Sequence, residues 1–336
     1  MSQPLVSVLM PVYNAGKDLA EAIQSILDQT YTNFEFIIVN DGSTDASRDV
    51  ISNFNDSRIH LIDNEVNKGL IATLNLGIDA CKGEYIVRMD ADDISLPERI
   101  EHQIAFLEAH SHYGLVGCWF EDFGDQIQSK VVRYSDDDTY IRIRHLYQTH
   151  IAHPTAVWRA SIIRAHQLKF DPAFVHGEDY EFWVRMSAYC KMSNVKEVLV
   201  RKRDHPHNVT NKYAQIMQDT CARVKQRQFS LMGINCSTDE VNLYSRFADG
   251  EWRFSPPQMD HLETLLESIF KANKHSKFIP VEAYNRYLAE KYYHLCYNNP
   301  DISKEGWKRF RKSSFSRLFK GKFQDNLKFR IKTLLR

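Results

Sequence analysis

Cysteine and long apolar runs are the two features that this sequence most lacks. Its six cysteines are scattered over 336 residues, with no C-x-x-C pair and no short loop to staple. This usage excludes a disulfide-stapled secreted domain and predicts reduced thiols in a cytoplasmic protein. The apolar stretch at residues 5–12 is far shorter than the ~20 residues of a membrane-spanning helix. No basic segment precedes it as in a secretory signal.

Net charge is also absent, but the balance is uneven along the chain. Lysine and arginine number 43, and so do aspartate and glutamate. Residues 304–336 carry 12 basic and two acidic residues, which leaves 31 basic and 41 acidic residues in the preceding part. The chain therefore combines an acidic body with a basic C-terminal segment. Its 43% of hydrophobic residues excludes global disorder, and its length predicts about two domains.

The first 120 residues alternate between strand-like and helix-like patterns. Short apolar runs predict strands, and apolar residues at helical spacing predict helices between them. Because the strands are apolar throughout and separated by helices, we expect an α/β fold with parallel strands and helices on both faces of the sheet. The predicted strands are residues 6–10, 36–39, 58–62, 84–89 and 115–120, and the predicted helices are residues 19–27, 69–81 and 97–107.

Polar and acidic residues follow three of these strands. Tyr13-Asn14 follows the first strand, Asp41-Gly42-Ser43 the second and Asp90-Ala91-Asp92-Asp93 the fourth. Ligands of such sheets bind beyond the carboxyl ends of the strands, so a nucleotide-type crevice is expected there. Two carboxylates at positions i and i+2 can both reach a hard divalent cation. Taken alone, the acidic segment is equally an ordinary turn, where aspartate is common for backbone reasons.

Five ordered motifs in the first hundred residues resemble family 2 glycosyltransferases. They are residues 8–14 (VLMPVYN), residues 39–45 (VNDGSTD), Asn67-Lys68-Gly69 with residues 75–77 (NLG), residues 83–86 (GEYI) and residues 90–93 (DADD). The resemblance extends more loosely to about residue 210 through His153-Pro154-Thr155, Gly177-Glu178-Asp179 and Arg203-Asp204-His205. It implies the A-type glycosyltransferase fold with a Rossmann-like, mostly parallel sheet, a nucleotide-sugar donor, a divalent metal and inversion at the anomeric carbon. The layout is also similar to members that assemble lipooligosaccharide and polysaccharide.

The resemblance assigns a donor site residue by residue. The donor-binding positions are Pro11, Val12, Tyr13, Asn14, Asp41, Lys68, Gly69, Asn75, Arg88, Asp90, Ala91 and Asp92. Tyr13 can stack on the base of a UDP-sugar, and the Asp41 carboxylate can accept from a base N–H. Asp92 and Asp90 match the positions beside Mn²⁺ or Mg²⁺ and the ribose, and His205 is a further candidate metal ligand. The family often has arginine just before the residue that matches Asn75, but this chain has leucine there.

Glu178 and Asp179 stand at the start of a helical stretch. In the family the aspartate of the matching pair is the general base, which implies Asp179 in this role with Glu178 as the alternate. A sugar hydroxyl is a poor nucleophile, and a positioned carboxylate can take its proton during attack. Acids also favour a helix N-terminus without any function. His153 matches a position on the acceptor side, and Trp183 can present an apolar face to a sugar, although core packing is an alternative for Trp183.

The C-terminal part has a different character. Residues 212–232, 257–273 and 281–297 are helix-like, and prolines separate them. We therefore expect a catalytic domain at residues 1–210, with a nucleotide-sugar half at 1–100 and an acceptor half at 101–210. A helical region at 211–303 and a basic amphipathic tail at 304–336 follow. The aromatic residues of the tail are Trp307, Phe310, Phe315, Phe319 and Phe323.

The basic and aromatic tail predicts a helix at an anionic membrane interface, peripheral to the inner face of the membrane. The alternatives are a helix docked on the acidic body and, least favoured, nucleic-acid binding. Because nothing upstream resembles a nucleic-acid module, no nucleic-acid partner is expected.

The function predicted from the sequence is an inverting glycosyltransferase. It moves a hexose or N-acetylhexosamine from a UDP-sugar to a saccharide hydroxyl of a glycolipid, lipooligosaccharide or polysaccharide precursor. A sugar-1-phosphate nucleotidyltransferase is one alternative, but residues 11–17 are not the Gly-rich basic loop of such enzymes. A non-catalytic nucleotide-sugar-binding partner is the other, and the presence of Asp90, Asp92 and Asp179 argues against it.

Overall fold

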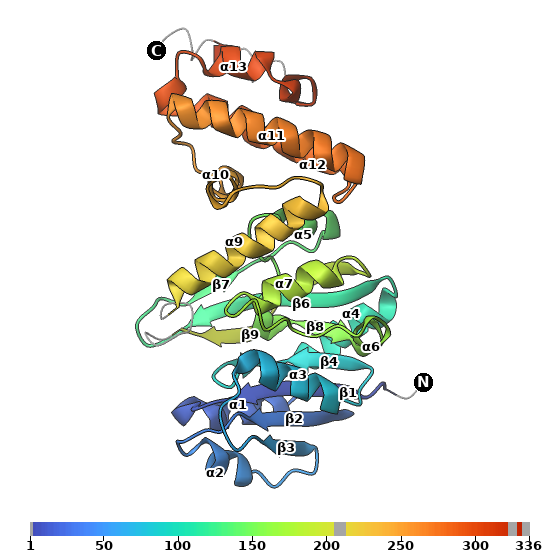
Figure 1. Ribbon diagram of the computed structural model, residues 1–336. Coiled ribbons are helices and arrows are strands. Elements are labelled where there is room, and N and C mark those ends of the chain that lie inside the picture. The colour runs from blue at the N-terminus through green and yellow to red at the C-terminus, as the bar shows by residue number, and fades with distance from the viewer. Residues whose placement is uncertain (1–2, 205–212, 322–327, 331–336) are drawn as a thin grey trace. The chain divides into compact units, whose positions relative to one another are not determined.

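The computed structural model describes residues 3–204, 213–321 and 328–330 and divides into two compact units (Figure 1). The first unit comprises residues 1–141 and 149–220, and the second comprises residues 142–148 and 221–336. The predicted boundary at residue 210 lies outside the described residues. The tail from residue 304 is distinct in charge but belongs to the same compact unit as the helices that precede it.

Nine strands within the described residues form the sheet of the first unit. They are β1 (Val6–Val12), β2 (Phe34–Asn40), β3 (Ile59–Asp63), β4 (Tyr85–Arg88), β5 (Ile94–Ser95), β6 (Tyr113–Phe123), β7 (Lys130–Val132), β8 (Val157–Arg159) and β9 (Lys191–Arg203). Their order is β3-β2-β1-β4-β8-β6-β9-β5, with β7 paired to β6. Strands β3, β2, β1 and β4 pair in parallel, as predicted. Strand β8 runs antiparallel to β4 and β6, and β6 and β9 pair in parallel again.

Helices cover both faces of this sheet. They are α1 (Leu19–Leu27), α2 (Ser47–Ser52), α3 (Leu70–Ala80), α4 (Arg99–Ala109), α5 (Asp138–Arg144), α6 (Ala160–His166) and α7 (Glu178–Met186), with 3₁₀ turns at Gly16–Asp18 and His153–Thr155. Val8 and Met10 of β1 share a buried cluster with α1, α2 and α4, whereas Leu9 shares one with α3, α6 and α7. Successive strand side chains point to opposite faces, so the two clusters are the two cores of a three-layer α/β arrangement.

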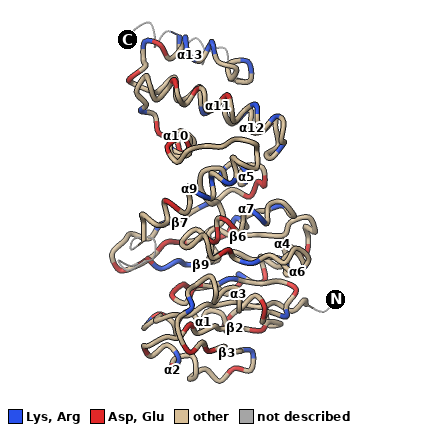
Figure 2. Tube along the Cα trace, viewed as in Figure 1, with Lys and Arg blue, Asp and Glu red and all other residues tan. Residues whose placement is uncertain are grey.

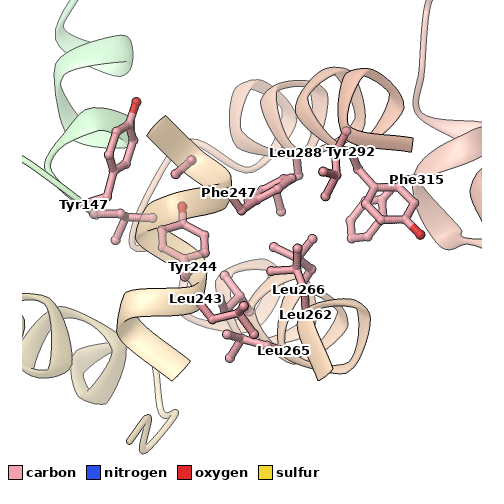
Figure 3. Packing of buried hydrophobic residues seen from close by; sticks show 14 of the residues in the cluster. Tyr147, Leu243, Tyr244, Phe247, Leu262, Leu265, Leu266, Leu288, Tyr292 and Phe315 are labelled. Atoms are coloured by element: carbon pink, nitrogen blue, oxygen red, sulfur yellow. The ribbon is translucent and has the colours of Figure 1, made fainter. Parts of the chain in front are cut away.

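The second unit is helical. Its elements are the part of α9 (Ala214–Leu231) from residue 221 on, α10 (Thr238–Asp249), α11 (Pro256–Ser276), α12 (Val281–Asn298), a 3₁₀ turn at Pro300–Ile302, α13 (Gly306–Lys312) and a 3₁₀ turn at Ser314–Arg317. Figure 3 shows aromatic and leucine side chains of α10, α11 and α12 packed together, with Tyr147 beside them. Helix α10, which the sequence analysis missed, begins with a capping box between Ser237 and Glu240.

The basic tail folds onto this helical core instead of forming one long amphipathic helix. Phe310, Phe315 and Phe329 are at most 2% exposed, and Figure 3 shows Phe315 beside Tyr292 of α12. Arg309 of α13 forms ion pairs with Asp260 and Glu263 of α11 and with Glu305. These aromatic side chains are therefore packed in the protein core, and the predicted binding of the tail to an anionic membrane stays a prediction.

Other aromatic side chains of the tail are also packed against the helical core. Trp307 and Phe319 are partly buried against the same core, whereas Phe323 lies outside the described residues. Figure 2 shows lysines and arginines along α13 in blue. Across the described part of the chain, no helix combines the length and the apolarity needed to cross a membrane.

Candidate active site

Asn14 joins the loop after β1 to the loop after β2. Its backbone N–H donates to Ser43 Oγ at 3.0 Å, and its side-chain Oδ1 accepts from the backbone N–H of Thr44 at 2.8 Å. Asn14 has a φ of 48°, a left-handed conformation that asparagine adopts more readily than most residues. The ring of the neighbouring Tyr13 is 51% exposed and can stack on a ligand. The two loops thus form one ordered edge with an accessible aromatic ring.

Asp41 holds the loop between β3 and α3 against the end of β2. Its Oδ1 accepts from Asn64 Nδ2 at 2.8 Å and from the backbone N–H of Lys68 at 2.9 Å. Its Oδ2 accepts from the backbone N–H of Gly69 at 2.9 Å. The structure therefore brings together three predicted donor residues and adds Asn64, which the sequence analysis missed. Asn64 stands only three residues before the recognised Asn67-Lys68-Gly69 motif, and that proximity is its only sequence signal.

Pro11 and Val12 lie inside β1 and are buried. They are paired in register with Val39 and Asn40 of β2, and the Val12 carbonyl oxygen accepts from the Asp41 backbone N–H at 2.8 Å. Their side chains thus support the loops at the end of the strand, and their predicted place in the donor site stays a prediction.

Asn75 is also a structural residue. Its Nδ2 donates to the Phe170 carbonyl oxygen at 2.9 Å, and its Oδ1 accepts from the Phe170 backbone N–H at 2.8 Å. The amide thus pairs with both backbone groups of one residue in the segment before α7. Both polar atoms of Asn75 are engaged in this clamp, and its predicted contact with the donor stays a prediction.

Three carboxylates come together after β4. One oxygen each from Asp90, Asp92 and Asp93 lies within 4.8 Å of the others, and Ala91 is the partly exposed residue of the turn between them. Asp93 is 2% exposed, and its Oδ2 has no hydrogen-bond partner among the described residues. Burial, followed by the charges of Asp90 and Asp92, raises the pKa of Asp93 well above its usual value. A hard divalent cation fits this set, since it binds oxygen ligands and offsets their repulsion.

The acidic cluster adds one residue to the metal set predicted from the sequence. Asp93 was recognised as part of the acidic cluster but was not assigned as a ligand, and its burial among the other carboxylates is the observation that adds it. His205, the third predicted ligand, lies outside the described residues. Its role stays a prediction.

Two buried arginines lie behind the acidic cluster. Arg88, which is 2% exposed, forms an ion pair with Asp90. Arg99 is fully buried and donates to the Arg88 carbonyl oxygen at 2.8 Å, and burial lowers the pKa of Arg99 to about 10. Buried charges need nearby opposite charges, so the guanidinium groups partly compensate the carboxylates. Arg88 thus acts at the predicted donor site through Asp90.

Arg203, at the end of β9, ties the acidic loop in place. Its backbone N–H donates to Asp93 Oδ1 and its Nε donates to the Asp92 carbonyl oxygen, both at 2.8 Å. Its Nη2 donates to Glu21 Oε2 of α1 at 2.5 Å. The sequence analysis recognised Arg203-Asp204-His205 only as a motif and gave Arg203 no role. The signal that could have found it is its place two residues before the predicted metal ligand His205.

The candidate base lies at the start of α7. Asp179 Oδ1 accepts from the Tyr180 backbone N–H at 2.7 Å. Burial, followed by the charge of Glu178, raises the pKa of Asp179 from 3.8 to about 7. The positive charge of Arg88 opposes the shifts of Asp179 and Glu178 and also that of Asp93. One guanidinium therefore lies within electrostatic reach of both the metal cluster and the candidate base.

His153 is buried beside Glu178. The His153 Nδ1 lies 3.9 Å from Glu178 Oε1, and the His153 Nε2 has no hydrogen-bond partner among the described residues. Burial, followed by the charge of Arg88, holds the pKa of His153 well below its usual value, so the ring is neutral. Trp183 has no exposed surface and packs against His153 and Trp158. The predicted sugar contact of Trp183 is corrected, because its ring faces the core.

Known sequences resemble this chain over most of its first unit. The sequence pattern described as Glycosyl transferase family 2 matches residues 7–165. A protein of Haemophilus influenzae, described as an uncharacterized glycosyltransferase, is 33% identical over 239 residues, which are 68% of this chain and 74% of that protein. The chain belongs to glycosyltransferase family 2.

One further relative has a name that specifies its reaction. WfgD of Escherichia coli, a UDP-Glc:α-D-GlcNAc-diphosphoundecaprenol β-1,3-glucosyltransferase, is 32% identical over 184 residues. The match covers 55% of this chain and 70% of WfgD.

Solved structures share the fold of this family 2 chain. TarS 1-349 of S. aureus in complex with UDP-GlcNAc matches with a TM-score of 0.57 at 14% identity, covering 97% of this chain and 91% of TarS 1-349. The mannosyltransferase PcManGT of Pyrobaculum calidifontis, in complex with GDP-Man and Mn²⁺, matches with a TM-score of 0.55 at 15% identity, covering 99% of this chain and 88% of PcManGT. These matches confirm the predicted A-type glycosyltransferase fold.

Proposed function

We propose that the chain is an inverting, metal-dependent glycosyltransferase that uses a UDP-sugar. The observation that carries the proposal is the grouping around Arg88, which forms an ion pair with Asp90 of the acidic cluster and whose charge also acts on Asp179, a carboxylate with a pKa of about 7. A transferase of this kind needs both parts: a cation for the diphosphate and a base for the acceptor hydroxyl.

The donor end of the site consists of the loops after β1, β2, β3 and β4. Tyr13 stacks on the uracil and Asp41 accepts from it, while Asp90 lies toward the ribose. Asp92 and Asp93 hold Mn²⁺ or Mg²⁺, with His205 as a further ligand. When bound, the cation offsets the negative charge that develops on the departing diphosphate. The complexes of TarS with UDP-GlcNAc and of PcManGT with GDP-Man and Mn²⁺ support a nucleotide-sugar donor and a divalent metal.

The base of the reaction is Asp179. It takes the proton of the acceptor hydroxyl as the oxygen attacks the anomeric carbon opposite the leaving diphosphate. A single displacement inverts the anomeric configuration and requires no enzyme nucleophile. Glu178 keeps the pKa of Asp179 high, and neutral His153 lies beside Glu178 on the acceptor side.

The acceptor we propose is a saccharide linked to a lipid diphosphate, and the transferred sugar is a hexose or N-acetylhexosamine. The similarity to WfgD, which is named for a GlcNAc-diphosphoundecaprenol acceptor, supports this class. The exposed basic side chains of the tail, among them Lys308, Arg311 and Lys312, would hold the protein at the anionic inner face of the membrane by charge alone.

A panel of UDP-sugars tests the proposal. We expect UDP release with one donor, in the presence of Mn²⁺ and a synthetic GlcNAc-diphosphate lipid, and a β-linked product from an α-linked donor, measured by NMR. EDTA should abolish release. Full turnover in EDTA, or an α-linked product, would contradict the metal role or the inverting mechanism.

The two alternatives are separated by the same assay. A sugar-1-phosphate nucleotidyltransferase would release diphosphate from UTP and a sugar phosphate, and a non-catalytic partner would bind UDP without releasing it from any donor. Membership in glycosyltransferase family 2 favours transfer over both.

A further inference from the structure

We propose that Asn64 is a positioning residue for the donor nucleotide. Its side-chain amide joins Asp41 to Lys68 and thereby sets the Asp41 carboxylate for recognition of uracil. The inference rests on the proposed UDP-sugar donor and adds a residue outside the recognised motifs. Asn64 touches neither the anomeric carbon nor the metal cluster, so its effect is on nucleotide recognition.

The amide of Asn64 forms a bridge between opposite charges. Its Nδ2 donates to Asp41 Oδ1 at 2.8 Å, and its Oδ1 accepts from Lys68 Nζ at 3.0 Å. Asn64 directly follows β3, and its backbone N–H donates to the Asn40 carbonyl oxygen at 2.9 Å, which fixes the residue against the end of β2. The side chain is 8% exposed. Lys68 is exposed, whereas Asp41 is 2% exposed, so the bridge restricts chiefly the Asp41 carboxylate to one arrangement.

Asparagine suits this position for chemical reasons. The orientation of the amide is determined, because the reverse orientation would direct the oxygen at the Asp41 carboxylate and the NH₂ group at the Lys68 ammonium. Aspartate at this position would accept from Lys68 but repel Asp41. Leucine has a similarly branched side chain but would leave both charged partners without their bond. The bridge thus requires one donor and one acceptor on a short side chain.

The bonds to Asp41 also indicate which oxygen remains for a ligand. A carboxylate offers about four acceptor positions. Asn64 and the Lys68 backbone occupy two on Oδ1, and the Gly69 backbone occupies one on Oδ2. The remaining position is on Oδ2, where it can accept from the N3–H of uracil. Cytosine has no proton on N3, so a correctly oriented Asp41 distinguishes the two bases.

Calorimetric titration of the full chain with UDP and with CDP tests this inference. Asn64→Leu should weaken UDP binding by about 10-fold to 100-fold, because a hydrogen bond to a charged group is lost. CDP binding should weaken less, so the ratio of the two affinities falls toward one. Asn64→Asp should weaken UDP binding further, since it places a second carboxylate beside Asp41.

The matched control is Glu65→Gln, which changes the exposed neighbouring side chain and should leave both affinities unchanged. Thermal unfolding checks that each variant is folded. If Asn64→Leu does not fold, Asn64→Ser replaces it, because serine is polar but too short to reach both partners. A folded variant with unchanged UDP affinity, or with UDP and CDP weakened equally, overturns the inference. A wild-type chain that binds neither nucleotide contradicts the proposed function itself.

Discussion

At the scale of single residues, Asp93 has the most unusual environment of the site. Its Oδ1 is held by the Arg203 backbone, whereas its buried Oδ2 has no hydrogen-bond partner among the described residues. Two further carboxylates lie within 4.8 Å. Burying like charges together is unfavourable unless a cation joins them. We therefore expect a bound cation to stabilise the cluster.

Asp93→Asn tests the hypothesis that Asp93 is a metal ligand. The substitution should lower the apparent affinity for Mn²⁺ by at least about tenfold, measured by Mn²⁺ titration. In EDTA the same variant should unfold at a higher temperature than the wild type, because one buried like charge is gone. Asp49→Asn, on α2 away from the acidic loop, is the control. Equal Mn²⁺ titrations for Asp93→Asn and the wild type would rule out Asp93 as a ligand.

With Asp179 as the proposed base, we expect the reaction to be sensitive to pH. Its pKa is raised from 3.8 to about 7, and only the ionised form accepts a proton. The rate should therefore rise with pH through about 7. Asp179→Asn should lower kcat by about 10²–10⁴-fold and remove the rise of the rate with pH. The UDP affinity of this variant should stay near that of the wild type. A pH–rate profile without a limb near neutrality would count against Asp179.

The raised pKa of Asp179 also makes the stability of the folded protein depend on pH. The folded protein holds Asp179 neutral up to about pH 7, whereas in the unfolded chain the group ionises near 3.8. Stability from this group therefore decreases as pH rises between these values. Above about pH 7, Asp179→Asn should have a larger free energy of unfolding than the wild type, measured by denaturant titration.

At the scale of elements, the site depends on close approach between the ends of β2 and β3. Gly42 has a φ of 66°, and a Cβ at this position would lie 2.6 Å from the Val66 carbonyl carbon. That contact is with backbone, so the β3–α3 loop would have to move. Only glycine combines this conformation with such a short separation.

Gly42→Ala should therefore reduce both stability and UDP affinity. The left-handed conformation alone costs about 1–3 kcal/mol, and displacement of the loop disturbs the bonds of Asp41 to Lys68 and Gly69. Gly16→Ala is the control, because Gly16 has a φ of 62° but open space around a Cβ. It should lose stability without the same loss of UDP binding. Equal UDP affinity in both variants would contradict the close-approach argument.

The elements also show which patterns are readable in sequence. Strands β1 and β2 are buried at every position, and an uninterrupted apolar run is easily recognised. Strand β9 is the longest strand of the described residues, but it was not predicted, because lysines, arginines and a glutamate occupy its exposed or half-exposed positions. Its pairing with β6 becomes visible only in the folded sheet.

At the scale of the whole molecule, the tail combines a buried aromatic side with an exposed basic side. Phe310 is 2% exposed and packs against Tyr292 and Tyr293 of α12. Lys308, Arg311 and Lys312 on the same short helix are exposed. We therefore expect folding of the helical unit and the proposed attraction to a membrane to depend on different residues.

Two sets of substitutions should separate these roles. Replacing Lys308, Arg311 and Lys312 together by glutamine should weaken binding to anionic vesicles by about 1 kcal/mol for each charge, with a smaller effect at high salt, and leave the thermal unfolding nearly unchanged. Phe310→Ala should instead destabilise the helical unit by about 3–5 kcal/mol. Vesicle binding that survives the glutamine substitutions would contradict the electrostatic role of α13.

The sequence by itself determined the parallel half of the sheet, the family, and the motifs after β1, β2 and β4. These features are readable because each depends on residues that are close together along the chain: an apolar run, a helical spacing, or acids directly after a strand. Asp179 was also recognised in this way, as part of a short acidic motif.

Only the tertiary structure decided which side chains meet. It paired Arg203 with Asp93 across 110 positions of the chain and Asn75 with Phe170 across 95, and it placed Asn64 between Asp41 and Lys68. It also buried Trp183, which the sequence analysis had placed beside the acceptor sugar, and Phe310, Phe315 and Phe329 of the tail. The physical reason is that composition and spacing specify the chemistry of a side chain, whereas its partner and its exposure depend on how distant segments pack.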